Sequence, residues 1–476
     1  MGAIIGMCSK KSTIVSSVGP TFLSNDSKSS SPSFDDPEHD PVFGEIKDGA
    51  VNYRSVGVVK ATILMVKLAI ALGVLAMPQV LLDVGGVPGV LIIVFFGLLT
   101  TWTGRVVGQF KTNHPEIYAM DGVGYVLAGW WGREFYSIIY SLFTIFCCSS
   151  GYITFSIAFN AITNHAACTV VWTVIAVVIT FIFSSLQTLN RVSILGWVGF
   201  VSIMTSIFII TIAVGLQGRP EAAPATGPWD KGIAVAKHHG TFLQGMSAVS
   251  TVVFSFCGIT AFLNVMGEMR QPKRYNQALY SAQAICTFTY LTIGIVVYYF
   301  CGQYISNPAL GSAGTIIKKV SYGVAIPGLL VGCILYTHMG AKMIFVRLLR
   351  GSEHLTSNSF IHWVTWLGTV GACVIIAFIL AESIPFFGEF ISLVGASLGT
   401  FLCLVTVGWM WFYDNWNKRK TDKSLNYKLL VALNAFVIVS GIFIIVAGTW
   451  AAATSISNAY KNGAISTPFS CVNNSK

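Results

Sequence analysis

Long stretches without a charged side chain dominate the sequence. Runs free of Asp, Glu, Lys and Arg span 84–104, 135–190, 192–218, 238–267, 275–317, 320–341, 354–381, 390–413 and 429–460. A helix that crosses a bilayer needs about 20 apolar residues. The run at 135–190 is long enough for two such helices and breaks at Asn164-His165, while 57–82 is apolar apart from Lys60 and Lys67. Apolar and polar positions do not alternate within the runs, which excludes a membrane β-barrel.

The pattern predicts an all-α integral membrane protein with eleven transmembrane helices. A ten-helix core is expected over 53–420, an eleventh helix within 421–456 and a C-terminal tail at 457–476. Residues 1–52 are rich in serine and carry an acidic cluster, so they are expected to form a disordered cytoplasmic tail. The predicted helices lie at 57–82, 86–110, 133–162, 168–188, 192–216, 241–268, 276–301, 322–348, 360–380, 387–412 and 429–454.

Composition supports this class. Hydrophobic residue types make up 54% of the 476 residues and charged types only 10%, whereas soluble proteins carry about 25% charged residues. A soluble enzyme, a nucleic-acid binder and a secreted disulfide scaffold are therefore excluded. The net charge of +10 is better explained by Lys and Arg in the cytoplasmic connections of a membrane protein than by binding to nucleic acid.

Lys and Arg are unevenly distributed between the two sets of connections. With the N-terminus in the cytoplasm, the cytoplasmic connections carry fifteen Lys and Arg residues and the external side carries seven. The positive-inside rule therefore favours a cytoplasmic N-terminus, and an odd number of spans places the C-terminus outside. We expect the plasma membrane, with the vacuolar membrane as the alternative. Cys168, Cys301 and Cys471 lie near the external face and can pair, but the sequence does not say which two do so.

Two predicted helices contain an interruption. In the first, Gly73 lets the backbone leave helical geometry and Pro78 lacks an N–H donor. In the sixth, small and polar residues occupy the middle of the span at 254–260. Backbone groups freed in this way cannot be satisfied by lipid, so they must line a cavity or bind a ligand. Breaks in the first and sixth helices suit two inverted repeats of five spans, which is a secondary-transporter pattern.

A zwitterionic amino acid suits such a site. Free N–H groups and helix N-termini favour its carboxylate, and free carbonyls favour its ammonium. No catalytic motif or paired carboxylate occurs within a span, so neither an enzyme nor a cofactor is expected. The predicted substrate-binding residues are Ala71, Leu72, Gly73, Val74, Phe254, Ser255, Phe256, Cys257 and Gly258.

These residues carry a family resemblance. The segment Lys67–Pro78, the Phe254-Ser255-Phe256 run with Glu268-Met269 fourteen residues on, and the eleven spans resemble the amino acid/auxin permease family, in particular fungal neutral amino acid permeases. The resemblance covers about 55–455 and implies the LeuT-type fold, with proton- or sodium-coupled amino acid uptake. Sodium-coupled animal relatives usually have Asn eleven residues before the proline of the first helix. This sequence departs from that pattern with Lys67.

Lys67 lies about 20 Å into the first predicted helix, too deep for its side chain to reach the interface. Its ammonium must face the protein interior or water. A fixed ammonium can replace bound sodium, and a buried lysine can titrate. The sequence therefore favours proton coupling at Lys67, and the alternative is a structural lysine that caps the carbonyls of the broken helices.

Three other residues complete the predicted machinery. His338 and Thr337 lie in the middle of the eighth helix, which faces the first in the fold that the resemblance implies, so either can meet Lys67. The alternative for His338 is a packed core residue. Glu268 ends the sixth helix and is a candidate gate, or a local partner of Arg270 or Lys273. Lys342 is expected to be an interfacial anchor.

The function predicted from the sequence is proton-coupled symport of neutral aliphatic or aromatic amino acids by alternating access. No carboxylate is expected at mid-span to hold a cationic side chain. The partners are then an amino acid and the lipid bilayer, while the oligomeric state stays open. The alternatives are a vacuolar exporter, a carrier of another small zwitterion, and a sensor that binds an amino acid without transporting it.

Overall fold

The computed structural model describes residues 39–40, 44–45 and 56–475, apart from 187–188, 225, 238–239, 350–351, 356–358, 385–386, 422 and 462–467. Two short antiparallel strands, β1 (His39–Asp40) and β2 (Gly44–Glu45), pair with each other. The predicted disordered tail at 1–52 otherwise lies outside the described residues.

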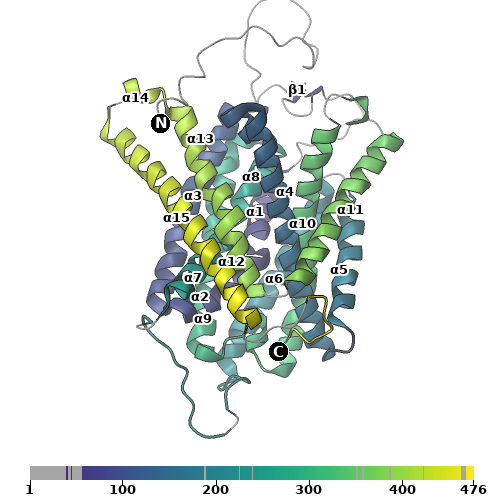
Figure 1. Ribbon diagram of the computed structural model, residues 1–476, viewed down its shortest axis with the longest axis vertical. Helices are drawn as coiled ribbons and strands as arrows, with labels where there is room; N and C mark the ends of the chain where they lie inside the picture. Colours follow the sequence, from purple (N-terminus) through teal and green to yellow (C-terminus); the bar gives the residue numbers. More distant parts are fainter. Residues whose placement is uncertain are drawn as a thin grey trace, which may run out of the picture.

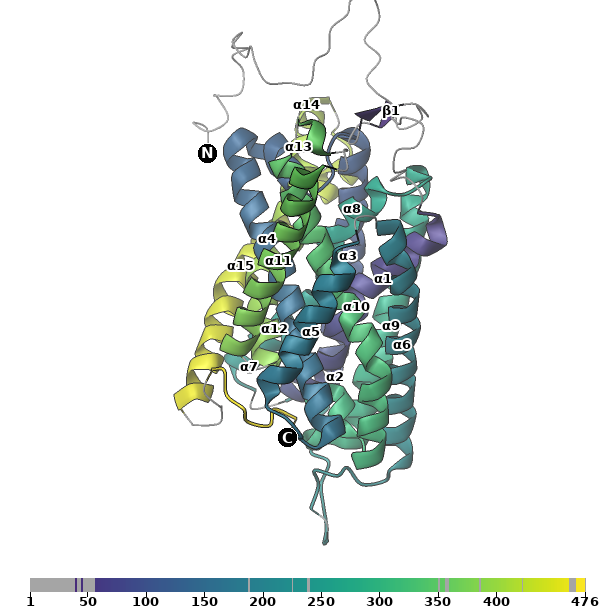
Figure 2. The same ribbon diagram turned by 90° about the vertical axis from the view of Figure 1, so that its right-hand side faces the viewer.

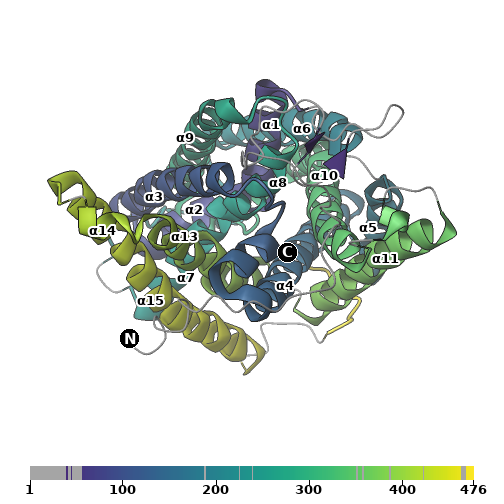
Figure 3. The same cartoon turned by 90° about the horizontal axis from the view of Figure 1, so that it is seen from above.

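The rest of the described chain is a bundle of long helices that run along one common direction (Figures 1 and 2). Viewed along that direction, α15 lies at the edge of the bundle, whereas α4, α7 and α8 are enclosed (Figure 3). The α-helices are α1 (Val58–Gly73), α2 (Met77–Val84), α3 (Gly86–Asn113), α4 (Met120–Thr163), α5 (Thr169–Ser184), α6 (Leu189–Leu216), α7 (Phe242–Phe256), α8 (Phe262–Gly267), α9 (Tyr275–Cys301), α10 (Thr315–Leu348), α11 (Phe360–Ser383), α12 (Phe387–Val394), α13 (Thr406–Asn415), α14 (Lys418–Thr421) and α15 (Leu425–Lys461).

Within the described residues, nine helices are long and apolar enough to cross a membrane, and the bent pair α1–α2 passes the same test as one span. The remaining predicted segment coincides with α5, whose 16 residues fall short of the length a crossing helix usually needs. The largest differences from the predicted boundaries are at three helices. A second helix from Met120 precedes the predicted span of α4 and joins it at a kink, where Gly129 has a positive φ of 64°. Helix α10 begins at Thr315, and α15 continues to Lys461.

Both predicted interruptions are present. Between α1 and α2 the chain forms a 3₁₀ turn at Val74–Ala76, and the two helices meet at 41°. Pro78 lies in the first turn of α2, where its missing N–H costs no intrahelical bond. A second 3₁₀ segment, Cys257–Ala261, separates α7 from α8. A third irregularity was not predicted: Gly395–Gly399 and Phe401–Val405, between α12 and α13, form π-helical turns.

The described part of the C-terminal tail crosses the end of the bundle that carries the C-terminus. Cys168 and Cys471 form a disulfide, which settles the pairing that the sequence left open, while the Cys301 thiol is free and buried. Nearby, the Thr169 hydroxyl donates to the Val472 carbonyl at 2.7 Å and the Asn474 amide donates to the Ser156 hydroxyl at 2.9 Å. These contacts tie the tail to α4 and α5.

Candidate functional site

The two broken helices contact each other at their breaks. A Cβ added to Gly73 would lie 2.3 Å from the Ser255 Oγ and 2.4 Å from the Ser255 Cα. A Cβ on Gly258 would meet the backbone of Leu68 and Ala69 at 3.0–3.1 Å. Backbones approach this closely only where a residue lacks a side chain. The residues predicted from the interruptions therefore meet in space, and glycine is required at the tightest point.

Two tyrosine hydroxyls bind the carbonyls near this junction. The Tyr290 hydroxyl, from α9, lies 2.7 Å from the carbonyl oxygens of both Ala69 and Ser255. Because a hydroxyl carries one proton, it donates to one of them at a time. The Tyr336 hydroxyl, from α10, donates to the Leu68 carbonyl at 2.6 Å. Neither tyrosine was predicted from the sequence, because a tyrosine within an apolar span has the same pattern as any packed aromatic residue.

Other predicted substrate residues surround the same junction. The Phe256 ring lies 5.0 Å from the Tyr290 ring, and Val74, Phe254 and Cys257 are buried. The Cys403 thiol, in the π-helical region, donates to the Cys257 carbonyl at 3.7 Å. The side chains of Ala71 and Leu72 lie outside the described part of the structure.

Lys67 is fully buried in α1, as its depth in the sequence predicted. Its Nζ has no hydrogen-bond partner among the described residues. The side chain extends toward α6 and α10, because its Cε would be 2.9 Å from a Cβ built on Gly199, beside Val331. Lys67 therefore packs against α6 and α10, whereas Ser255 belongs to α7.

The structure does not show His338 and Thr337 in contact with Lys67. The Thr337 hydroxyl donates to the Cys148 Sγ of α4 at 3.2 Å. The His338 ring packs edge-on against Trp366 of α11, with ring centroids 5.5 Å apart. Consecutive positions on α10 therefore face different helices: Tyr336 faces α1, Thr337 faces α4 and His338 faces α11.

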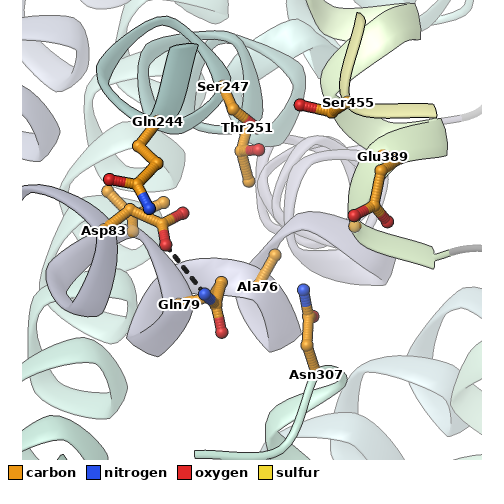
Figure 4. Close-up of a pocket in the computed structure, with 11 residues that line it drawn as sticks. Ala76, Gln79, Asp83, Gln244, Ser247, Thr251, Asn307, Glu389 and Ser455 are labelled. Atoms are coloured by element: carbon orange, nitrogen blue, oxygen red, sulfur yellow. Dashed lines mark hydrogen bonds between the residues drawn. The ribbon is translucent and has the colours of Figure 1, made fainter. Parts of the chain in front are cut away.

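A polar cavity of about 180 Å³ lies at the end of the bundle that carries the C-terminus, where the end of α2 meets the starts of α7 and α12 (Figures 1 and 4). Its floor includes Ala76, at the end of the first break, and Thr251, one turn before Ser255. Carboxylates from two elements face it, and Gln79 donates to Asp83 at 2.8 Å. The lining residues are Ala76, Gln79, Val80, Asp83, Gln244, Ser247, Thr251, Asn307, Gly388, Glu389 and Ser455.

At the opposite end, buried polar contacts join α8 to its neighbours. The Lys342 ammonium, from α10, lies 2.7 Å from the Glu268 carboxylate, with the two side chains 6% and 1% exposed. The Tyr118 hydroxyl also donates to Glu268, at 3.0 Å. Lys342 is therefore buried, and the prediction that it is an interfacial anchor is wrong. Glu268 pairs with a residue on another helix, as a gate requires.

The chain segment before α1 adds to this closure. The Val56 N–H donates to the Glu268 carbonyl at 3.1 Å, and the Arg270 N–H donates to the Val56 carbonyl at 2.8 Å. The segment therefore pairs with the chain just after α8 as a short stretch of sheet. These contacts join the segment before α1 to the end of α8.

Comparisons with known proteins agree with this arrangement. A family model described as "Transmembrane amino acid transporter protein" matches residues 54–454. A "Transmembrane transporter" of Gibberella moniliformis is 38% identical over 91% of this chain and 91% of its own length. An "N amino acid transport system protein" of Neurospora crassa is 31% identical over 90% of each chain.

Solved structures share the fold at low sequence identity. A nucleobase-cation-symport-1 family transporter in a closed conformation aligns with a TM-score of 0.54 and 14% identity, over 89% of this chain and 97% of its own. A Na⁺-coupled sialic acid symporter in an outward-open state aligns with a TM-score of 0.52 and 12% identity, over 85% and 91%. The arrangement of helices is thus one found in coupled transporters.

Proposed function

Because the chain belongs to the transmembrane amino acid transporter family, we propose that it carries neutral aliphatic or aromatic amino acids across a membrane in symport with protons. The family membership and the transporter fold support a secondary transporter, and the finer statement is our inference from the site.

One observation carries the proposal: access to the junction of the broken helices differs between the two ends of the bundle. The cavity reaches Ala76 and Thr251 from the end that carries the C-terminus. The buried Glu268–Lys342 pair closes the other end. A transporter that works by alternating access must have such one-sided states, with breaks in two helices at the centre. The described state is then the one open to the C-terminal side.

We further propose eleven spans, with α1–α2 opening the first repeat of five and α7–α8 opening the second. In this arrangement each repeat begins with a broken helix, and α15 is the additional span. Its position at the edge of the bundle is consistent with a helix outside the transporting core (Figure 3). The broken helices move together against the other helices. Gly73 therefore stays against Ser255, and Gly258 stays against Leu68 and Ala69, while the two ends of the bundle open in turn.

The chemistry around the junction favours a neutral amino acid. Carbonyls of Leu68, Ala69 and Ser255 offer acceptors for an α-ammonium if the tyrosine hydroxyls turn away. The described carboxylates that line the cavity, Asp83 and Glu389, lie outward of the breaks. Among the described residues, a substrate with a cationic side chain therefore has no carboxylate partner beside the junction.

Lys67 is the proposed coupling group. An ammonium buried without a hydrogen-bond partner is costly, by several kcal/mol. Its protonated form is therefore favoured only where water, substrate or a protein group reaches it. A group whose protonation depends on conformation can link a proton gradient to the alternation of the two ends.

The proposed orientation has the N-terminus in the cytoplasm and the C-terminus outside, or in a lumen. Lys and Arg are more numerous in the connections at the N-terminal end. The Cys168–Cys471 disulfide lies at the other end, and disulfides persist in oxidising compartments. These two observations are independent, and both favour a cytoplasmic N-terminus over the reverse orientation.

Uptake of labelled leucine or phenylalanine into proteoliposomes, without sodium and with an inward proton gradient, tests the proposal. We expect accumulation above the external concentration that an ionophore abolishes. Accumulation that requires sodium would contradict proton coupling, and binding without accumulation would identify a sensor. Efflux of preloaded amino acid from an acidic lumen, without uptake under an inward proton gradient, would identify a vacuolar-type exporter. A panel of the twenty amino acids as competitors would show whether the substrate is instead another small zwitterion.

A further inference from the structure

The cavity at the end of the bundle that carries the C-terminus has a carboxylate on each of two walls. Asp83, near the end of α2, and Glu389, in the first turn of α12, lie on opposite sides of it (Figure 4). The other lining residues are uncharged. Asp83 accepts a hydrogen bond from Gln79 at 2.8 Å, and neither carboxylate belongs to an ion pair within the described part of the chain. The cavity therefore holds two negative charges without a directly bound counter-ion from the described protein.

The lysine beside this end of α2 does not line the cavity. The Lys237 backbone N–H donates to the Val84 carbonyl at 3.2 Å, and the Lys237 ammonium donates to the Leu82 carbonyl at 3.3 Å. Its positive charge thus caps the last carbonyls of α2, and its side chain is exposed to solvent. Carboxylates in a cleft with low-dielectric walls attract cations from solution. The charge of the cavity therefore selects a cationic ligand.

A second observation, at the inner end of the cavity, points to a ligand independently of this charge. Thr251 is 7% exposed, and its side chain points into the cavity (Figure 4). Its hydroxyl has no hydrogen-bond partner among the described residues, although its carbonyl accepts from the Ser255 hydroxyl at 2.8 Å. The side-chain oxygen of Gln244 accepts from the Thr241 N–H at 3.2 Å, which leaves the Gln244 amide N–H groups as donors. A carboxylate on the ligand would satisfy both kinds of donor.

We propose that this cavity binds a dibasic amino acid, such as arginine or lysine, and that the bound amino acid blocks transport instead of being carried. Its two cationic groups pair with Asp83 and Glu389, and its carboxylate accepts hydrogen bonds from Thr251 and Gln244. The inference rests on the proposed transport of neutral amino acids through the same cavity.

Two separate positive charges fit the cavity better than one. A neutral amino acid carries a single ammonium group, so it leaves one of the two carboxylates unpaired. A metal ion needs several ligands around one point, and no group of three or more His, Cys, Asp or Glu side chains in the described chain is placed to hold one. A dibasic amino acid supplies one cation for each wall.

The second charge also stops the dibasic amino acid before the junction of the broken helices. The carbonyls of Leu68, Ala69 and Ser255 offer acceptors there for one ammonium group. A second cation that moved inward from Asp83 or Glu389 would be buried without a counter-ion, which is strongly unfavourable. The ligand therefore stays in the cavity and obstructs the path to the junction.

The first test measures how external arginine inhibits uptake of labelled leucine, with uptake of labelled arginine followed in parallel. We expect arginine to inhibit and not to accumulate. Asp83→Asn and Glu389→Gln each remove one charged partner, so the ratio of the arginine inhibition constant to the leucine KM should rise about tenfold. The matched control is Asp230→Asn, because Asp230 is exposed in the loop before α7 and accepts from the Gly232 N–H at 3.1 Å. This control should leave the ratio within about twofold.

The second test detects binding without transport. Ser247 lines the cavity, so Ser247→Cys can be alkylated by a membrane-impermeant maleimide from the C-terminal side. We expect arginine to slow this alkylation, and citrulline, which has a similar shape without the side-chain charge, to protect less. Glu389→Gln in the same protein should raise the arginine concentration needed for half-protection about tenfold.

The outcomes separate the inference from the proposed function. Arginine that neither inhibits leucine accumulation nor protects Ser247→Cys would overturn the inference and leave the proposed function intact. Failure of leucine to accumulate would overturn the proposed function, while the protection assay would still decide whether arginine binds. Arginine that accumulates as leucine does would overturn both the block and the proposed selectivity. An equal effect of Asp230→Asn, or equal protection by citrulline, would overturn the pairing with Asp83 and Glu389. If one carboxylate variant fails to fold, the other provides the same test.

Discussion

The buried pair Glu268–Lys342 makes a quantitative prediction about the balance between the two proposed conformations. Its charged atoms are 2.7 Å apart, and both side chains are almost fully excluded from water. Removing one partner of such a pair costs about 3–5 kcal/mol, because a buried charge loses its counter-ion. We expect α8 and α10 to separate when the end of the bundle that holds this pair opens, so that water then reaches Glu268. The cost of removing Lys342 therefore falls only on the described state, in which this end is closed.

The substitution Lys342→Met keeps the length of the side chain and removes its charge. A cost of about 3 kcal/mol moves the equilibrium by about 100-fold toward the state open at this end. If the wild type favours the described state by 10:1, the variant would favour the other state by about 10:1. The cavity at the opposite end would be open about one tenth as often.

Alkylation of a cysteine in that cavity reports the change directly. Ser247 lines the cavity, so Ser247→Cys can be labelled by a membrane-impermeant maleimide from the C-terminal side. The unpaired cysteines of the described residues are all buried, and Cys8, which lies outside them, is replaced by Ser in the background. We expect Lys342→Met to slow labelling about tenfold.

The control is the Arg347–Glu134 pair at the same end of the bundle. Its side chains are 28% and 30% exposed, so it contributes about 1 kcal/mol or less, and it joins α10 to α4, which move together in the proposed mechanism. Arg347→Met should therefore leave the labelling rate within about twofold. A folded Lys342→Met protein that labels at the wild-type rate would refute the reasoning, because the pair would then not distinguish the two states.

Three further substitutions test the junction and the tail. Gly73→Ala places a methyl group within 2.4 Å of the Ser255 backbone, so we expect uptake to be lost and the free energy of unfolding to fall by about 2 kcal/mol or more, as followed by thermal melting. Tyr290→Phe removes a donor from two buried carbonyls and should lower the free energy of unfolding by about 1–3 kcal/mol, with reduced uptake. Cys471→Ser removes the disulfide and should lower the free energy of unfolding by about 2–5 kcal/mol. A reducing agent should have the same effect on the wild type and no effect on the variant.

Two changes serve as matched controls. A Cβ on Gly245, near the start of α7, meets nothing within 4 Å, so Gly245→Ala should fold and transport normally. Tyr280 on α9 is 45% exposed, so Tyr280→Phe should leave stability unchanged. If Gly245→Ala lost as much stability as Gly73→Ala, the contact at Gly73 would not explain the loss. The same holds for Tyr280→Phe and the contacts of Tyr290.

The helices and the two breaks could be predicted from the sequence because each has a local cause. Apolar length indicates a spanning helix, and Gly73 with Pro78 marks a place where helical geometry ends. The π-helical turns at Gly395–Val405 have no comparable local signal. They pack against residues that lie far away in the sequence, since a Cβ on Gly399 would lie 2.5 Å from the Cys257 sulfur.

The rotation of each helix about its axis could not be predicted in the same way. Successive residues of an α-helix point about 100° apart, so a small error in rotation changes the neighbour. His338 was expected to be able to meet Lys67 and instead packs against Trp366, whereas Tyr336, two residues earlier, contacts α1. Lys342 was misplaced for a related reason, because its partner Glu268 lies 74 residues away.

In the proposed mechanism, protons enter with the amino acid and Lys67 carries the coupling. The most direct test records leucine uptake and acidification of the lumen together, in proteoliposomes that contain a pH-sensitive dye, for the wild type and Lys67→Met. We expect the wild type to acidify the lumen in step with uptake, and Lys67→Met to bind leucine but neither accumulate it nor move protons. Equal acidification and accumulation by the two proteins would contradict it.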